Sequence, residues 1–91
     1  MLLESFAEFI MSTKSTAIPK AAIDAANHAL TDTIGVMVAG SQEPVSRKVN
    51  SLIGQVAGTD GCTVVARSTR ASVSEAALAN GTFAHALDFD D

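Results

Sequence analysis

The last twelve residues, 80–91, hold the densest group of reactive side chains in the sequence. His85 is followed by Asp88, Asp90 and Asp91, so that three carboxylates fall within four positions. Carboxylates this close repel one another and require solvent, a cation or a reacting substrate to be stable. We therefore expect a functional site here, and we expect the chain to be the front part of a larger enzyme, interrupted within its active-site motif.

The spacing of His85 and Asp88 is compatible with proton-transfer chemistry. Residues three apart share one face of a helix, with Cβ atoms about 5–6 Å apart. A histidine–carboxylate pair can move protons near neutral pH. The same spacing also suits a salt bridge at a helix end, and the pair alone favours that simpler role.

The string Asp88-Phe-Asp-Asp91 has three interpretations. A calcium loop would need more oxygen ligands and a glycine at its sixth position, beyond residue 91. An aspartyl-phosphate enzyme also uses Asp-x-Asp, but its aspartate follows a buried strand, whereas residues 84–87 continue a helical pattern. The third interpretation is acid–base chemistry on a small acid substrate. No zinc-ligand spacing is present, because the single cysteine and the two histidines lie far apart.

Composition limits the partners and the size of the core. The net charge is −4, with ten acidic against six basic residues, which argues against a nucleic-acid partner. Hydrophobic residues make up 47% of the chain, but many are alanine and there is no Trp or Tyr. The core that such a chain builds alone is thin, because alanine buries little area. We expect the chain to be stabilised by packing against something else.

The single cysteine, the longest apolar run and the N-terminal residues bear on disulfides and on the location of the chain. Cys62 is the only cysteine, so no intramolecular disulfide is possible, and we interpret it as a small buried residue. Polar residues interrupt the longest apolar run, 21–39, which excludes a membrane span. Because no signal peptide is visible, we predict a cytoplasmic protein.

Apolar periodicity predicts four helices that must position the C-terminal string. They cover residues 2–11, 19–39, 45–56 and a segment that starts near 72. Pro19 suits the first position of the second helix, and Gly40 suits its stop. Residues 62–66 are β-branched and short, which predicts an extended stretch, and residues 67–70 are predicted to form a turn.

The last predicted helix contains one strong signal and one anomaly. Ser72 and Glu75 match a capping box at its start. Asn80-Gly81 interrupts it, and a glycine inside a helix costs about 1 kcal/mol relative to alanine. We expect close helix packing or a nearby ligand to offset that cost.

The second predicted helix carries a group of polar residues. His28 has Asp24 and Asp32 four residues on either side. We predict a surface ion pair for His28 rather than catalysis. For Asp32, a position on the helix surface is favoured over a buried acid.

Residues 80–91, Asn80-Gly-Thr-Phe-Ala-His-Ala-Leu-Asp-Phe-Asp-Asp91, resemble the signature of the MmgE/PrpD family. That family includes 2-methylcitrate dehydratase, cis-aconitate decarboxylase and iminodisuccinate epimerase. Earlier segments are similar to the family in the expected order. They are Phe6–Ile10 followed by Ile18-Pro19, and Leu30–Gly35 followed by Ala39-Gly40.

The resemblance implies an all-α fold for residues 1–91, as the N-terminal portion of the large helical domain, with one short extended stretch near Cys62–Ala66. Family members add a smaller lid domain, usually form homodimers, and hold their active site between the domains. The resemblance makes Asp88 the catalytic residue, with His85, Asp90 and Asp91 in supporting or substrate-binding roles. It implies neither a metal nor an organic cofactor.

The function implied by the resemblance is that of a cofactor-independent lyase acting on a citrate-like di- or tricarboxylate, as 2-methylcitrate dehydratase does. A decarboxylase-like or epimerase-like member is the alternative. Residues 1–91 alone are expected to be inactive, because the family's later histidine, lysine and tyrosine positions lie beyond them. Alternatives from other classes are a non-catalytic helical interaction module and a divalent-cation site at Asp88, Asp90 and Asp91.

Overall fold

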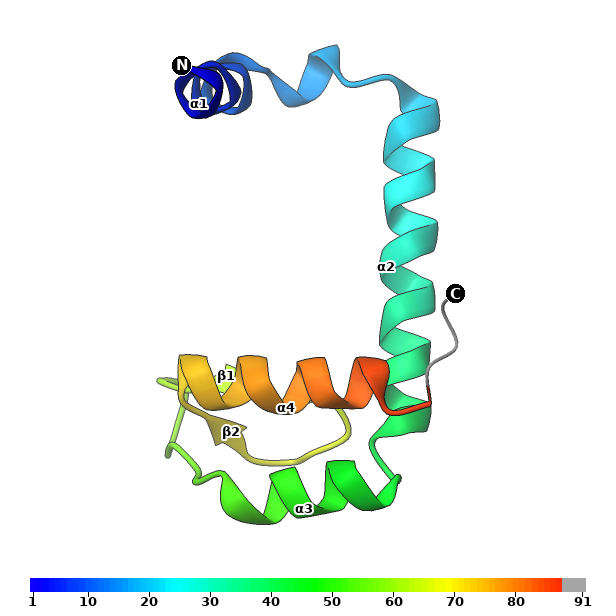
Figure 1. The fold of residues 1–91 in the computed structure, drawn as a ribbon, viewed down its shortest axis with the longest axis vertical. Coiled ribbons are helices and arrows are strands. Elements are labelled where there is room, and N and C mark those ends of the chain that lie inside the picture. The colour runs from blue at the N-terminus through cyan, green and yellow to red at the C-terminus, as the bar shows by residue number, and fades with distance from the viewer. Residues whose placement is uncertain (88–91) are drawn as a thin grey trace.

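The computed structural model describes residues 1–87 of the 91-residue chain. Four α-helices, a short 3-10 helix and two short strands make up this part. In Figure 1 they form a bracket that opens to the left: α1 is the upper arm, α2 is the upright, and α3, α4 and the strands form the lower body. The predicted helical fold is confirmed. The extended stretch predicted near residues 62–66 is formed only in part, because residues 62–63 form a strand and residues 65–66 form a turn, with Ala66 at a φ of 60°.

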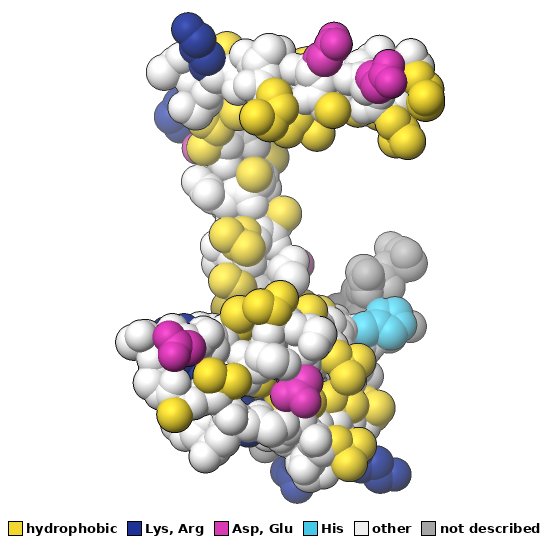
Figure 2. Space-filling model, turned by 90° about the vertical axis from the view of Figure 1, so that its left-hand side faces the viewer, with side chains coloured by type: hydrophobic (Ala, Val, Ile, Leu, Met, Phe, Trp, Pro, Cys, Tyr) yellow, Lys and Arg dark blue, Asp and Glu magenta, His cyan; other side chains and the backbone are white. Residues whose placement is uncertain are grey.

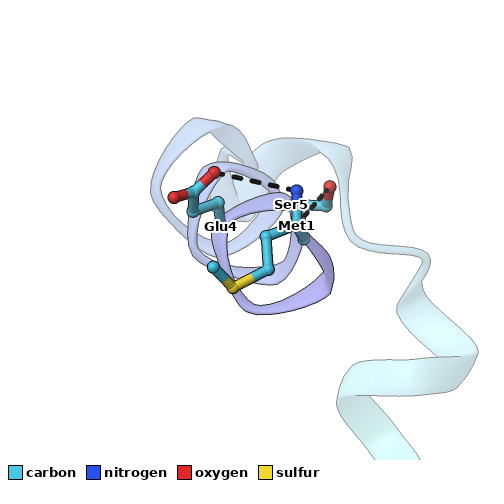
Figure 3. Close-up of polar contacts among 3 residues, drawn as sticks. All are labelled: Met1, Glu4 and Ser5. Carbon is cyan, nitrogen blue, oxygen red and sulfur yellow. Dashed lines mark hydrogen bonds and ion pairs between the residues drawn. The ribbon is translucent and has the colours of Figure 1, made fainter.

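Helix α1 spans Leu2–Ser12. At its start the Ser5 hydroxyl donates to the Met1 carbonyl at 3.1 Å, and the terminal ammonium lies 3.7 Å from the Glu4 carboxylate (Figure 3). Both ionic groups are largely exposed, so their attraction adds little stability. None of the residues of α1 is buried. Its apolar face therefore points to solvent, and no core holds the helix against the lower body.

Helix α2 spans Lys20–Gly40 and follows the 3-10 helix η1, Ser15–Ala17. Pro19 is the N-cap rather than the first helical residue, so the helix begins one residue later than predicted. Near the start of the helix, the Lys20 ammonium contacts the Asp24 carboxylate at 2.7 Å. Gly40 was predicted to lie just past the helix, but it is the last helical residue and the only buried one in α2.

Helix α3 spans Pro44–Leu52 and ends four residues earlier than predicted. Beyond it the chain turns inward: Ile53 is buried, and the Val56 backbone N–H donates to the Arg70 carbonyl at 2.8 Å. Helical spacing alone suggested that Ile53 and Val56 continue the helix. Gly54, which is unfavourable inside a helix, lies between them. The backbone of this segment therefore pairs with the strand region instead of continuing the helix.

Strands β1, Cys62–Thr63, and β2, Arg70–Ala71, pair antiparallel, with Cys62 opposite Ala71 and Thr63 opposite Arg70. The prediction of a turn over residues 67–70 is therefore wrong at Arg70, which joins this ladder. Val64, next to β1, is fully buried, and Cys62 is half-buried against the core.

Helix α4 spans Val73–His85, with Ser72 as the N-cap. The Glu75 backbone N–H donates to the Ser72 hydroxyl at 3.3 Å, which confirms the predicted cap. The other half of the predicted box is not formed in this way, because the Glu75 carboxylate accepts from the Gly54 N–H at 3.2 Å. Glu75 thereby ties α4 to the segment that follows α3.

The core lies where α4 packs on α2, α3 and the strands. Its buried apolar residues in the described part are Ile53, Val64, Ala71, Ala76, Ala79 and Phe83. Half of these residues are alanine, so the thin core expected from composition is confirmed. None of the helices within residues 1–87 is long and apolar enough to cross a membrane.

Candidate functional site

The candidate site is the C-terminal end of α4. His85 is the last residue of that helix and is exposed. Asp88, Asp90 and Asp91, which the sequence places in the site with His85, lie outside the described residues. The structure therefore defines the helix that leads to the acidic string and the surface beside His85.

A shallow, mainly apolar hollow of about 470 Å³ lies beside His85. One wall comes from Val45 of α3, and the rest comes from the exposed face of α4 and the residue after it. The lining residues of α4 and its end are Ala77, Leu78, Gly81, Thr82, His85 and Ala86. Such a surface offers apolar contact next to one titratable ring.

The last turn of α4 is positioned by its crossing with the end of α2. A Cβ added to Gly40 would overlap the Phe83 carbonyl oxygen and lie 3.4 Å from the Ala86 Cβ. Only glycine permits so close an approach, because the obstructing atom is backbone and cannot rotate away. The Phe83 side chain is 1% exposed, so this end of α4 is also anchored in the core.

The same junction includes the start of α3. The Ser46 hydroxyl donates to the Gly40 carbonyl at 2.6 Å, and Ser46 is fully buried. The Gly40 carbonyl also accepts from the Glu43 backbone N–H at 3.2 Å. The two bonds together satisfy a carbonyl at the end of α2, where the helical ladder leaves such groups without partners. We call Gly40, Ser46 and Phe83 the three-helix junction, because they bring together α2, α3 and α4.

Asn80 has a structural role that sequence reasoning missed. Its side-chain oxygen accepts from the Val65 N–H at 2.8 Å, and its side-chain NH₂ donates to the Thr63 carbonyl at 2.9 Å. A mid-helix asparagine, a poor helix former, was the available signal. The sequence analysis treated Asn80 only as part of a turn-like pair.

Gly81 behaves differently from Gly40. No heavy atom of the described part lies within 4 Å of a Cβ built at Gly81. Close helix packing, one of the two expected offsets for this glycine, is therefore not found among residues 1–87. The position lies one helical turn before His85 and opens onto the hollow beside it.

The polar residues on α2 do not form the predicted ion pair of His28. Asp24 instead pairs with Lys20, which lies four residues before it on the helix and carries a full positive charge. Asp32 is exposed, as the surface interpretation predicted. Within residues 1–87, no group of three or more His, Cys, Asp or Glu side chains is arranged to hold a metal ion.

Arg67 is the most extensively bonded cation of the described part. Its guanidinium donates to Thr69, to Asn50 and to the Gly54 carbonyl, at distances of 2.6–3.3 Å. These bonds connect α3, the segment after it and the strand region. The guanidinium therefore serves the fold rather than an open site.

The amino-acid sequence of the chain matches one known class of protein domain. A family model described as the MmgE/PrpD N-terminal domain matches residues 4–91, which includes the whole string from Asn80 to Asp91. The chain therefore belongs to the MmgE/PrpD family. Comparisons with curated proteins and with solved structures gave no match to this chain.

Proposed function

We propose that the chain supplies the N-terminal helical part of a lyase that acts on a citrate-like di- or tricarboxylate, as in the dehydration of 2-methylcitrate. The observation that carries the proposal is the family match over residues 4–91, which runs through His85 and the acidic string. His85, the last residue of α4, lines the apolar hollow, and Asp88 follows it three positions later in the sequence.

The chemistry explains why a carboxylate is needed. In a dehydration, a base removes a proton from the carbon next to a carboxylate, a C=C bond forms, and an acid protonates the hydroxyl, which leaves as water with no change in redox state. A positioned carboxylate or histidine transfers such protons, and cationic groups stabilise the developing enolate-like charge. We assign the proton transfer to Asp88, with His85, Asp90 and Asp91 supporting it.

The cations that would neutralise a tricarboxylate are not assigned to this chain. Arg67 is engaged in three hydrogen bonds, and Arg70 donates to the Gly61 carbonyl at 3.0 Å. Both therefore hold backbone and loop groups together. We propose that the cationic groups come from another segment of the polypeptide, and that residues 1–91 alone are inactive.

The test is Asp88→Asn in a full-length polypeptide that contains this segment. We expect kcat to fall by roughly 10²–10⁴-fold, the usual contribution of general acid–base catalysis, with folding intact. Asp60→Asn is the matched control, because Asp60 is an exposed acid in the loop before β1. Turnover like that of the wild type would remove Asp88 from the mechanism.

The substrate distinguishes the members of the family. Parallel assays with 2-methylcitrate, cis-aconitate and iminodisuccinate separate a dehydratase from a decarboxylase and an epimerase. We propose the dehydratase, and conversion of cis-aconitate or iminodisuccinate alone would replace it with the corresponding alternative.

We further propose that the full-length protein is a homodimer, and that the apolar face of α1 contributes to its interface. That face consists of large side chains that are 55–74% exposed: Leu2, Leu3, Phe6, Phe9 and Ile10. Figure 2 shows hydrophobic side chains gathered on the side of the upper arm that faces the lower body. Glu4 and Glu8 occupy the other side of the helix, so no charge interrupts the face.

The exposed area supports a large interface. The accessible surface is 6884 Å², about 1,900 Å² more than a folded monomer of 9.3 kDa normally exposes. Obligate interfaces bury about 1,000 Å² or more per partner. The excess is therefore large enough to form one.

Light scattering tests this proposal with two variants of the full-length protein. Phe6→Glu places a charge in the apolar face and should dissociate the dimer. Ser12→Glu introduces the same charge on the polar side of α1 and should leave the dimer intact. A wild-type monomer, or a Phe6→Glu variant that remains dimeric, would show that the face is covered by something other than a second copy.

A further inference from the structure

We infer that Asn80 is a positioning residue for the reaction proposed above, and the inference rests on that proposed function. Asn80 lies in the middle of α4, five residues before His85. It is not among the residues that line the hollow beside His85. Its effect on the chemistry would come through the placement of the helix.

The Asn80 side-chain amide forms hydrogen bonds with two backbone groups of the segment that contains β1. It accepts from the Val65 N–H at 2.8 Å and donates to the Thr63 carbonyl at 2.9 Å. An amide flipped by 180° would bring oxygen against oxygen and NH₂ against N–H, so only one orientation satisfies both bonds. This pair of bonds fixes how α4 is rotated about its axis relative to β1.

The bonds of Asn80 are one fixed point of α4. The contact of Gly40 with Phe83, which lies one helical turn after Asn80, is the second. The backbone of α2 contacts the Phe83 carbonyl there, at a distance that excludes any Cβ. One point restricts the rotation of α4, and the other restricts the position of its last turn. Together they determine where α4 ends, and so where His85 and the residues after it begin.

Small errors in this placement matter because acid–base catalysis requires the proton donor and acceptor within hydrogen-bond reach of the substrate. A displacement of about 1 Å at a distance from the chemistry can cost about 10²-fold in rate. A residue that only stabilised the fold would change the fraction of folded protein instead. Turnover per folded molecule therefore separates the two roles.

The decisive variant is Asn80→Asp in the full-length polypeptide. It preserves the shape and the acceptor for the Val65 N–H but removes the donor to the Thr63 carbonyl. We expect kcat per folded molecule to fall by about 10²-fold, with a smaller change in KM. The folded fraction is measured by circular dichroism at the assay temperature. Asn27→Asp is the matched control, because Asn27 is an exposed asparagine on α2.

A second pair of variants keeps the test valid if Asn80→Asp does not fold. Gly40→Ala should shift the last turn of α4 and lower kcat, whereas Gly35→Ala should not, because its Cβ would meet no atom within 4 Å. Unchanged kcat per folded molecule in Asn80→Asp, or in Gly40→Ala where the first does not fold, overturns the inference. A folded wild type that is inactive on all three substrates overturns the proposed function itself, and the inference with it.

Discussion

At the scale of single residues, Phe83 contributes to the structure in two separate ways. Among residues 1–87 its side chain is the largest fully buried one, and its carbonyl oxygen is the atom that α2 approaches at Gly40. The aromatic side chain therefore fixes the depth of α4 in the core, while the backbone fixes the crossing with α2. Three of the other five core residues are alanines, so little else could replace this contact.

We predict that Phe83→Ala lowers the free energy of unfolding by about 3–5 kcal/mol, because it removes a buried ring and leaves a cavity. Urea unfolding followed by circular dichroism measures the change. Leu52→Ala is the matched control: Leu52 is 83% exposed, and an exposed substitution normally changes stability by less than about 0.5 kcal/mol. Equal losses in the two variants would contradict the described core.

The sequence revealed some residue roles and concealed others. Ser72 and Glu75 were recognisable as a cap because a helix start has a local pattern, and the bond between them is present. The two bonds of Asn80 join residues 15 and 17 positions apart. Such a partnership exists only after the chain has folded, so no local pattern could have identified it.

At the scale of elements, glycines with the same helical setting differ in what surrounds them. Gly35 and Gly40 both belong to α2. A Cβ at Gly35 meets no atom within 4 Å, whereas one at Gly40 overlaps the backbone of α4. Gly35 therefore destabilises α2 without any packing benefit, whereas Gly40 is required for the close approach of α2 to α4.

Gly35→Ala should therefore stabilise the 91-residue chain by about 0.5–1 kcal/mol, because alanine loses less backbone entropy in a helix. Gly40→Ala should destabilise it, since the backbone of α4 must move. Thermal unfolding of the two variants side by side checks the prediction. A destabilised Gly35→Ala variant would indicate a neighbour at Gly35 in solution.

The number and order of helices were predictable, but several of their ends were not: α4, for example, ends at His85, although residues 84–87 keep a helical pattern. Apolar spacing located all four, because a helix repeats its buried face every three to four residues. The end of α3 was predicted four residues too late, since Ile53 and Val56 keep the helical spacing while serving the core and the bridge to Arg70. The spacing of apolar residues cannot distinguish a helical residue from one that packs in the core outside a helix.

At the scale of the whole molecule, the described chain is extended. Its radius of gyration is 16.5 Å, whereas a compact domain of this length has about 12 Å. The difference arises because α1 and most of α2 stand away from the lower body, as Figure 1 shows. The packed contacts lie around α4, so stability should differ between the two parts of the molecule.

Hydrogen exchange of the 91-residue chain should reveal this division. We predict rapid exchange of backbone amides in α1 and slow exchange in the buried part of α4, around Ala76, Ala79 and Phe83, because only the latter is covered by a core. Mass spectrometry of peptic fragments resolves the two helices. Equal protection in α1 and α4 would mean that α1 is covered in solution.

The family was predictable from the string at residues 80–91, and the match over residues 4–91 confirms it. The roles of Asp88, Asp90 and Asp91 remain predictions, since these residues lie outside the described part. His85 was correctly placed on a helix that ends beside an apolar hollow. The walls of that hollow were not predictable, because Val45 comes from a different helix.

The attachment of α2 at one end has a mechanical consequence. With 21 residues and a rise of about 1.5 Å each, α2 is a rod of about 31 Å. A tilt of about 5° at its contact with α4 would carry the far tip through nearly 3 Å by this length. Conversely, a partner bound at the far tip of α2 would act through the whole length of the helix on its angle to α4. A large displacement of the tip would then correspond to a small displacement beside His85.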